Sequence, residues 1–318
     1  MSKRSGFAGE RLPESVELPA GVGRDFPLAR LTTVRTGGPA ELFARVGSAE
    51  RLLKLIGWAG EHGLAVAVVG SGSNLLVADE GVRGLVLKLD GELAGIEREG
   101  ACLTCGAGAR LPAVAAFAAR VGLSGIEFGV NIPGTVGGAV RMNANAYGGS
   151  LGEALAWVEL ATPARELVRR APGELGLGYR SSKIGAAGEI VTRARFALTQ
   201  RSVEEVKATL EQMRRRRHEA QPRGIRTFGS TFKNPEDPRA GERTAGMLLD
   251  QAGCAGLAIG GARFAPKHAN FIENTGLART AEVVALMAEG RRRVLERFGV
   301  ELEPEVHTLG AVRFPWRD

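Results

Sequence analysis

The stretch from Gly129 to Gly149, GVNIPGTVGGAVRMNANAYGG, constrains the fold of this chain more than any other. Its six glycines cost backbone entropy in a helix or a strand, so we expect an irregular segment. Bare backbone N–H groups can approach a large anion closely, which predicts a phosphate or pyrophosphate site. The alternative is a solvent-exposed linker, and apolar residues such as Ile132, Val136, Val140 and Met142 argue against it.

A second glycine-rich turn, GSGSN from Gly70 to Asn74, follows the short apolar segment 64–69. A strand that runs into such a turn presents successive amides and two hydroxyls, which suits a pyrophosphate. The turn is neither a G-x-G-x-x-G, because Leu75 stands at the position of the last glycine, nor a P-loop, because it lacks a Lys-Ser/Thr end. Two such loops in one domain predict a cofactor site better than either loop alone.

Length and composition indicate a mixed globular protein. The 318 residues suffice for two or three packed units, and 44% of them are hydrophobic, which allows sizeable cores. Helix-period and strand-like segments alternate, so we expect mixed α and β structure. The sequence shows no apolar run of membrane-spanning length and no signal-peptide pattern, so we expect a cytoplasmic protein.

The cysteines and the charged residues limit which cofactors and partners the sequence is compatible with. Cys102 and Cys105 form a C-x-x-C, which is either a redox pair or, as we favour without a thioredoxin-like context, two ordinary buried thiols. With no second pair and four histidines, we expect no metal site. The net charge of +7 includes the clusters Arg214–Arg217 and Arg291–Arg293, so nucleic acid and phosphorylated small molecules are both candidate partners. Aromatic residues do not interleave with these clusters, so no stacking platform is visible.

Periodicity, caps and turn residues predict the regular elements. Ser48 is the expected N-cap of one helix, Thr280 of another, and Ser202 with Glu205 forms a capping box that opens a third near a change in composition. We place a domain boundary just before this box. Expected helices cover residues 49–62, 111–120, from 203 onward, 244–252 and 281–298, and expected strands cover a strand–turn–strand at 31–46, then 64–69, 85–89, a hairpin at 155–168, 190–198 and the strand-like 301–310.

Two short clusters contain residues that could carry chemistry. In GYRSS, Arg180 beside Tyr179 can hold a carboxylate with two hydrogen bonds, and a plain surface turn is the alternative. In FGSTFKNP, Ser230 has Lys233 and Asn234 behind it but no nearby histidine, so a proton donor is a better interpretation than a nucleophile. A Ser/Thr-rich β-turn is the alternative for this second cluster.

Two further clusters are less specific. His268 lies among apolar residues in PKHANF, and a structural histidine is slightly favoured there. In EPEVH, either Glu303 or Glu305 would alternate inward on a strand and could face a reacting centre.

These motifs occur in a fixed order, and together they resemble a known family. GSGSNLL, NIPGTVGGAV with MNANAYGG, GYRSS, GSTFKNP, KHANFI and EPEV are similar to segments of the UDP-N-acetylenolpyruvoylglucosamine reductases, the MurB family. The resemblance implies an α+β FAD-binding fold of the vanillyl-alcohol oxidase type with two α+β subdomains, followed by a C-terminal α+β substrate-binding domain. We therefore expect a mobile N-terminus at 1–20, FAD-binding subdomains at 21–89 and 90–201, and a UDP-sugar domain at 202–318.

The resemblance also implies an activity. It implies an enzyme, a UDP-N-acetylmuramate dehydrogenase of peptidoglycan synthesis, cell shape and cell division, that binds FAD non-covalently and uses NADPH as co-substrate. UDP-N-acetylglucosamine enolpyruvate would be reduced to UDP-N-acetylmuramate, with hydride from flavin N5 and a proton from Ser230. We expect a cytoplasmic monomer with no nucleic-acid partner and no membrane insertion.

Roles are carried over by matching motifs. Ser230 matches the proton donor, Arg180 the arginine that stabilises the enolate and its carboxylate, and Glu305 the assisting acid. The substrate-binding matches are Tyr179, Arg217, Lys233, Asn234, His268 and Asn270, with His218 left open as the phosphate-binding residue. The FAD-binding matches are Gly70, Ser71, Gly72, Ser73, Asn74, Leu75, Asn131, Pro133, Gly134, Thr135, Gly137, Gly138, Asn143 and Ala144.

The sequence departs from the family pattern at a few positions. Asn131 replaces a glycine, Thr227-Phe228 replaces a Ser-Ala pair, and His307 stands where arginine is frequent. The segment after Tyr179 has no room for an inserted loop whose tyrosine covers the substrate, so the chain resembles the short form of the family. Three alternatives stay open: another flavoprotein of this fold, a non-enzymatic nucleotide- or nucleic-acid-binding protein, and an inactive flavin-binding regulator.

Overall fold

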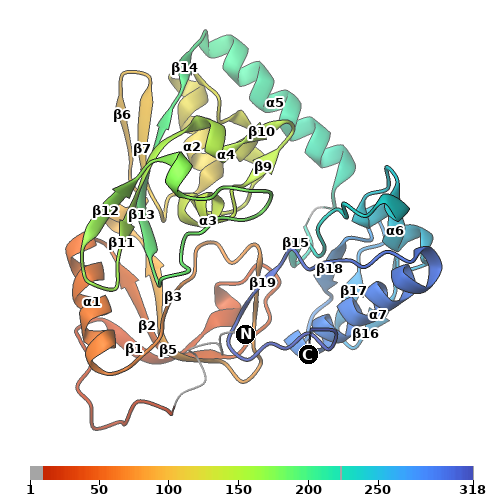
Figure 1. Cartoon of the computed structure of the whole chain (residues 1–318), viewed down its shortest axis with the longest axis horizontal. Coiled ribbons are helices and arrows are strands. Elements are labelled where there is room, and N and C mark those ends of the chain that lie inside the picture. The colour runs from red at the N-terminus through yellow and green to blue at the C-terminus, as the bar shows by residue number, and fades with distance from the viewer. Residues whose placement is uncertain (1–9, 223, 318) are drawn as a thin grey trace.

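The computed structural model describes residues 10–222 and 224–317, which form a larger part with two main sheets and a smaller C-terminal part with one (Figure 1). Helices and strands are mixed throughout, so the expected α+β class is confirmed. Within the described ranges, no helix is both long enough and apolar enough to cross a membrane.

The first sheet has four strands in the order β1-β2-β5-β3, with β1 antiparallel to β2 and the other neighbours parallel. Ser48 accepts a hydrogen bond from the Arg51 amide at 3.3 Å, which confirms the predicted N-cap of the helix α1. The strands and the helix are β1 (Val22–Pro27), β2 (Pro39–Val46), α1 (Ala49–Glu61), β3 (Val66–Val68) and β5 (Val82–Leu89).

The segment before β2 differs from the prediction. Residues 31–34 form a turn and bends and residues 35–38 are irregular, so the first strand of the expected strand–turn–strand is wrong. The segment is instead held against the loop after β3, because the amide of Thr33 donates to the carbonyl of Gly72 at 3.1 Å and that of Gly38 to Ala78 at 2.8 Å. Its hydrogen bonds are therefore made with a loop that is distant in sequence, which local periodicity does not reveal.

The second sheet has five antiparallel strands in the order β12-β11-β13-β7-β6, and the predicted hairpin at 155–168 is confirmed. One continuous apolar core joins the inner faces of this sheet, its helices, the first sheet and α1. The elements are β6 (Ile96–Glu99), β7 (Cys102–Gly106), α2 (Leu111–Arg120), β8 (Leu123–Ser124), α3 (Val136–Arg141), β9 (Asn145–Ala146), β10 (Gly149–Ser150), α4 (Leu151–Ala154), β11 (Leu155–Ala161), β12 (Leu167–Arg170), β13 (Ile190–Ala197) and β14 (Thr199–Gln200).

The C-x-x-C lies along β7, where its two cysteines are free thiols. Cys105 is fully buried in the core, and burial raises the pKa of its thiol to about 12. Cys102 is half-buried rather than buried. A thiol with so high a pKa is a poor nucleophile, so the interpretation as ordinary thiols is the better one.

The C-terminal part has its own core and a four-stranded antiparallel sheet in the order β15-β18-β17-β16. The capping box of Ser202 and Glu205 is confirmed at the start of α5, the long helix that spans from the larger part toward the smaller one in Figure 1. The elements are α5 (Val203–Ala220), β15 (Thr227–Ser230), α6 (Ala245–Gln251), β16 (Ala258–Ile259), β17 (Ala262–Phe264), β18 (Phe271–Asn274), α7 (Thr280–Phe298) and β19 (His307–Leu309).

The two parts are joined at the start of α7. Thr280 is not its N-cap as predicted, because the cap residue is Arg279 and the Thr280 hydroxyl donates to the carbonyl of Val77 at 2.7 Å. The carboxylate of Asp79 accepts from the amides of Thr280 and Ala281 at 2.9 Å each, so an acid from the larger part caps this helix. In addition, β19 pairs in parallel with β4 (Leu75–Val77), although the rest of 301–310 is not strand.

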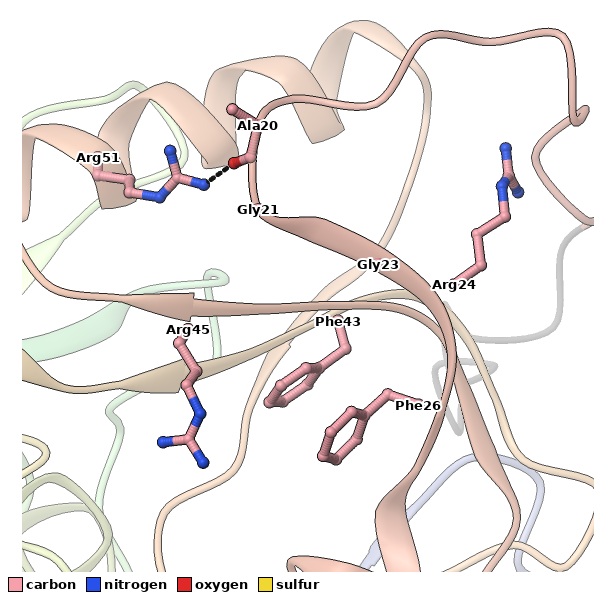
Figure 2. Close-up of a pocket in the computed structure, with 8 residues that line it drawn as sticks. All are labelled: Ala20, Gly21, Gly23, Arg24, Phe26, Phe43, Arg45 and Arg51. Carbon is pink, nitrogen blue, oxygen red and sulfur yellow. Dashed lines mark hydrogen bonds between the residues drawn. The ribbon is translucent and has the colours of Figure 1, made fainter.

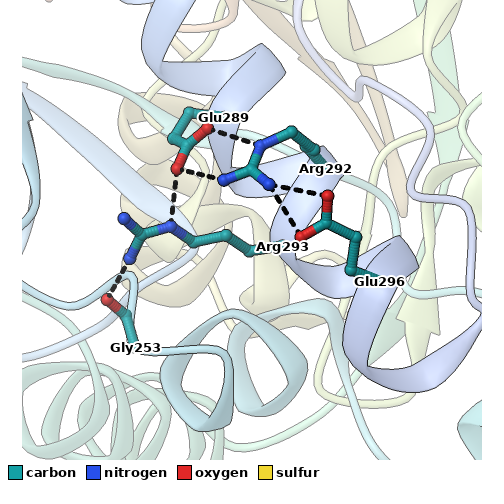
Figure 3. Close-up of polar contacts among 5 residues, drawn as sticks. All are labelled: Gly253, Glu289, Arg292, Arg293 and Glu296. Atoms are coloured by element: carbon teal, nitrogen blue, oxygen red, sulfur yellow. Dashed lines mark hydrogen bonds and ion pairs between the residues drawn. The ribbon is translucent and has the colours of Figure 1, made fainter.

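The arginine run on α7 belongs to a network of ion pairs (Figure 3). Arg292 bridges Glu289 and Glu296, and Arg293 contacts Glu289 at 2.7 Å and the carbonyl of Gly253 at 3.0 Å. Hydrogen bonds from both arginines lower the pKa of Glu289 to about 2. This cluster of positive charge is thus paired within the fold and fastens α7 to the end of α6.

The predicted mobile N-terminus falls in two parts. Residues 1–9 lie outside the described residues. Residues 10–20 contact the rest of the fold, since Leu12 is buried and Arg24 donates to the carbonyls of Leu12 and Pro13 at 3.1 and 2.8 Å.

Candidate functional site

The two glycine-rich loops lie against each other. A Cβ on Gly70 would stand 2.4 Å from Oγ1 of Thr135, and one on Gly134 would stand 3.9 Å from Oγ of Ser73. Gly72 has a φ of +61°, and a Cβ there would overlap the carbonyl of Leu31. Glycine is therefore required at Gly70 and Gly72 for the loops to meet.

The backbone of both loops is oriented by hydrogen bonds to its carbonyls. The carbonyl of Gly72 accepts from Thr33 at 3.1 Å, and that of Gly134 from Leu111 at 3.0 Å. In a trans peptide the C=O and the next N–H point in opposite directions, so these bonds turn the amides of Ser73 and Thr135 away from the scaffold.

Several of these amides are free to bind a ligand. Within the described part of the chain, the backbone N–H groups of residues 71–74 and of Gly134 and Thr135 donate to no acceptor. Grouped N–H donors without side chains in front of them form a cradle for an anion. The residues present thus fit the pyrophosphate of a dinucleotide cofactor.

The second loop is more regular than expected. Residues 136–141 form the short helix α3 despite two glycines, because Gly137 packs closely against β7's end, where a Cβ would stand 2.9 Å from that of Ala107. The expectation of an irregular segment is therefore wrong for this part of the run. Gly138 is exposed and Ala144 is buried.

Two asparagines of the second loop bind protein rather than solvent. Asn131 is buried and donates to the carbonyl of Met213 at 2.7 Å, which fastens α5. Asn143 donates to the carbonyl of Gly178 at 3.1 Å and accepts from the Gly152 amide at 3.0 Å. In this structure both side chains support neighbouring segments of the site.

Arg180 and Glu305 form the charged centre of the site. Nε of Arg180 lies 2.8 Å from Oε1 of Glu305, and both side chains are largely buried, with 21% and 14% of their surface exposed. The N–H of Nε is not directed along this line, so the buried donor has no aligned acceptor. Arg180 itself has a φ of +51° and donates from Nη1 to the carbonyl of Asn145 at 3.2 Å. A buried arginine with spare donors suits a carboxylate ligand.

The choice between the two acids of EPEVH follows from their surroundings. Glu303 is exposed and pairs with Lys233 at 3.4 Å, whereas Glu305 turns inward to Arg180. Burial raises the pKa of Glu305, and Arg180 and Lys233 partly offset this. Glu305 is therefore the acid that a reacting centre at Arg180 would meet.

Ser230 ends β15 next to this pair. The backbone carbonyl of its neighbour Thr231 accepts from the amide of Glu305 at 2.9 Å, so the segments that carry Ser230 and Glu305 are bonded together. Asn74 of the first loop donates its side-chain amide to the carbonyl of Glu305 at 3.1 Å. The first glycine-rich loop and Thr231, the residue after Ser230, are thus both hydrogen-bonded to the backbone of Glu305, whose side chain pairs with Arg180.

The remaining predicted substrate residues make contacts within the C-terminal part or are exposed. Asn270 is buried and both accepts from and donates to the backbone of Phe232 at 2.9 Å, so it holds the strand after Ser230. Asn234 accepts from the amide of Ala245 at 3.1 Å at the start of α6. His268 accepts from the Asn270 amide at 3.3 Å, and burial lowers its pKa. Tyr179 is exposed beside Arg180.

Arg217 lies in a groove of about 650 Å³ between α5 and the second loop. Its guanidinium donates to the carbonyl of Asn131 and meets no carboxylate in the described ranges, and burial lowers its pKa. Arg110, Pro133 and His218 also line the groove. A half-buried cation paired with a carbonyl is suited to hold a phosphate.

A second hollow of about 660 Å³ lies on the first sheet, and Figure 2 shows its lining. Phe26 and Phe43 stack there with ring centroids 3.9 Å apart. Its arginines are occupied, since Arg45 pairs with Asp90 at 3.0 Å and Arg51 donates to the carbonyl of Ala20. It contains no predicted site residue, so we do not assign a catalytic role to it.

Some residues of the site were not predicted from the sequence. Thr33 orients the first loop, and Lys88 donates from Nζ to the carbonyl of Gly70 at 2.8 Å. The feature of the sequence that could have indicated Lys88 is the charged residue near the end of the apolar strand VRGLVLKL. Thr33 carries no comparable signal. The described residues also contain no group of three or more His, Cys, Asp or Glu that could hold a metal ion.

The facing amide loops fit a dinucleotide cofactor, and comparison with known proteins places the chain among the FAD-binding oxidoreductases. The family model described as FAD binding domain matches residues 40–170, and the one described as UDP-N-acetylenolpyruvoylglucosamine reductase, C-terminal domain, matches residues 221–309.

Similar whole proteins agree with both matches. The chain is 41% identical to UDP-N-acetylenolpyruvoylglucosamine reductase 2 of Symbiobacterium thermophilum over 96% of this chain and 97% of that protein, and 42% identical to the reductase of Agathobacter rectalis over 95% and 96%. The crystal structure of the MurB reductase from Thermus caldophilus superposes with a TM-score of 0.77 at 39% identity, covering 89% of this chain and 97% of that one. The chain belongs to the UDP-N-acetylenolpyruvoylglucosamine reductase family, which confirms the resemblance and the expected FAD-binding fold.

Proposed function

We propose that this protein catalyses the NADPH-dependent, FAD-mediated reduction of UDP-N-acetylglucosamine enolpyruvate to UDP-N-acetylmuramate. The observation that carries the proposal is the chain of hydrogen bonds that ties Asn74 of the amide loop to Glu305, and Glu305 in turn to Thr231 beside Ser230. Because Glu305 also pairs with Arg180, these bonds bring the amide loop and an arginine suited to bind a carboxylate into one site.

FAD would be held by backbone amides rather than by charged side chains. The free N–H groups of residues 71–74, Gly134 and Thr135 support binding of its pyrophosphate. When bound, FAD supplies the hydride that the protein itself cannot. The other matched residues of the two loops would surround it, with Asn131 and Asn143 acting through the segments that they support.

Arg180 would bind the carboxylate of the enolpyruvyl group and stabilise the negative charge that builds on it. Preorganised donors in a buried site stabilise such charge strongly, and the unaligned N–H of Arg180 is such a donor. Glu305 keeps the guanidinium in position, and its raised pKa suits an acid that assists proton delivery.

Ser230 would deliver the proton to the carbon next to the one that receives hydride. Its place on β15 is held by Asn270 through the backbone of Phe232. Lys233, Asn234, Tyr179 and His268 would bind or frame the substrate, and Arg217 would meet the pyrophosphate of UDP. NADPH would use the same site first and leave before the UDP-sugar enters. We also infer a cytoplasmic monomer without a nucleic-acid partner, which sedimentation and a DNA-binding titration test.

Visible absorption of the purified protein tests the proposal. We expect a yellow protein whose flavin bleaches with NADPH under anaerobic conditions and regains its colour when UDP-N-acetylglucosamine enolpyruvate is added. A yellow protein that bleaches but stays bleached with this sugar would indicate another flavoprotein. A colourless protein that cannot be reconstituted with FAD would contradict the cofactor site.

A further inference from the structure

Lys88 is a charged residue in an otherwise apolar position. It lies in β5, in which the neighbouring residues Leu85, Val86, Leu87 and Leu89 are buried, and it is itself half-buried. Desolvation lowers the pKa of its ammonium, so the charge adds nothing to the packing of β5 that the apolar stem alone would not provide. The stability of the fold therefore does not explain why a charged residue stands at this position of β5.

The contacts of Lys88 point to the first glycine-rich loop. Its Nζ donates to the carbonyl of Gly70 at 2.8 Å, and no carboxylate among the described residues lies within ion-pair distance of it. The carboxylate that acts electrostatically on Lys88 is that of Asp90, which is already paired with Arg45 at 3.0 Å. Arg45 and Arg110 add further positive charge near the ammonium. The ammonium is thus a cation whose partner in the fold is a single carbonyl.

The direction of that hydrogen bond matters for the loop. Because the C=O of Gly70 is drawn toward Lys88, the N–H of Ser71 in the same trans peptide points the opposite way, toward the face with the free amides. The carbonyl of Gly72 is fixed in the same manner by Thr33. Lys88 and Thr33 therefore orient the peptides that carry the amides of Ser71 and Ser73.

We propose that Lys88 is a positioning residue for FAD, which fixes the amides of the 70–74 loop toward the pyrophosphate and adds an uncompensated positive charge behind them. The inference rests on the proposed assignment of this loop to FAD. It goes beyond that assignment because no residue of β5 belongs to the predicted cofactor site.

Titration of the apoprotein with FAD, followed by flavin fluorescence, tests the inference. We expect Lys88→Met to raise the Kd for FAD roughly 10- to 100-fold, the range of a charge-assisted hydrogen bond. Lys88→Arg should stay within about 3-fold of the wild type because it keeps a charged donor. Arg45→Met is the matched control, since it removes a nearby charge that does not contact the loop, and it should also stay within about 3-fold.

Thermal stability of the same apoproteins separates positioning from a structural role. Lys88→Met apoprotein should melt at the wild-type temperature or above it, because a half-buried, desolvated charge is gone. If this variant does not fold, Lys88→Leu, which likewise has no donor, is expected to show the same loss of FAD affinity. A Lys88→Met apoprotein that binds FAD like the wild type, or that loses stability in step with affinity, would overturn the inference. Failure of the wild type to bind FAD would instead contradict the proposed function.

Discussion

The two halves of the site handle negative charge in different ways. The glycine-rich loops offer backbone amides and two serine hydroxyls, and their geometry depends on close backbone packing at Gly70 and Gly72. The centre at Arg180 and Glu305 uses a buried ion pair of side chains, 2.8 Å apart. The loops therefore bind negative charge through the conformation of their backbone, whereas the Arg180–Glu305 centre binds it through charged side chains.

This difference predicts how each half responds to change. A backbone cradle has no side chain to remove, so it fails when its conformation is blocked, and the cofactor is lost with it. When one side chain of the Arg180–Glu305 centre or its neighbours is removed, the rest of the site stays in place. One reaction step then slows, while cofactor binding and the fold persist. Substitutions in the two halves should therefore have separable effects.

Blocking the loop should have the largest effect. In Gly72→Ala the new Cβ would overlap the carbonyl of Leu31, and alanine is strained at a φ of +61°. We expect purified Gly72→Ala protein to contain little or no flavin and to melt well below the wild type, as measured by visible absorption and a thermal scan.

Gly60→Ala is the matched control for this substitution. It lies on α1 with nothing within 4 Å of the added Cβ, so it should keep its flavin and its stability. A Gly72→Ala protein with full flavin content would contradict the view that the cradle depends on backbone conformation.

Removing the proton donor should affect one half-reaction. Ser230→Ala should leave flavin reduction by NADPH nearly unchanged and slow reoxidation by the enolpyruvyl substrate by about 10²- to 10⁴-fold, the range for a general acid. Stopped-flow absorption separates the two steps.

Thr231→Val, at the residue next to Ser230, is the matched control. The Thr231 hydroxyl is buried without a partner in the described residues, so its removal should leave both half-reactions close to wild type. Equal slowing of both half-reactions by Ser230→Ala would exclude Ser230 as the proton donor.

The smallest expected effect is on the pH dependence of the melting temperature when Glu305 is replaced. The folded-state pKa of Glu305 is raised above its unfolded value, so its ionised form destabilises the fold at pH values above that pKa. Glu305→Gln should therefore melt a few degrees above the wild type near neutral pH. The difference should vanish as the pH falls below the ordinary glutamate range, where the wild-type residue is protonated in both states. Scanning fluorimetry between acid and neutral pH measures this.

The exposed Glu303 provides the comparison. Glu303→Gln should melt like the wild type across the same pH range, because its side chain is in solvent and its pair with Lys233 is a surface contact. Lower stability of Glu305→Gln than of wild type at neutral pH would show that the pair with Arg180 outweighs burial.

Local patterns were enough to predict most helices. Ser48 begins α1, the box of Ser202 and Glu205 begins α5, and residues 111–120 form α2, because caps and periodicity act within one or two turns. Predictions were wrong where a distant segment supplied the partner. Residues 31–36 bond to the loop around Gly72, and Thr280 bonds to Val77, so neither follows its local pattern.

By itself, the sequence determined the family and predicted the two glycine-rich loops and the candidate chemical groups, because glycine runs and short motifs are local properties. The tertiary structure decided which groups meet. It turned Glu305 rather than Glu303 toward Arg180, used Asp79 to cap α7, and brought Lys88 to Gly70. These contacts join residues far apart in the chain, so they depend on how sheets and domains pack rather than on any spacing that the sequence displays.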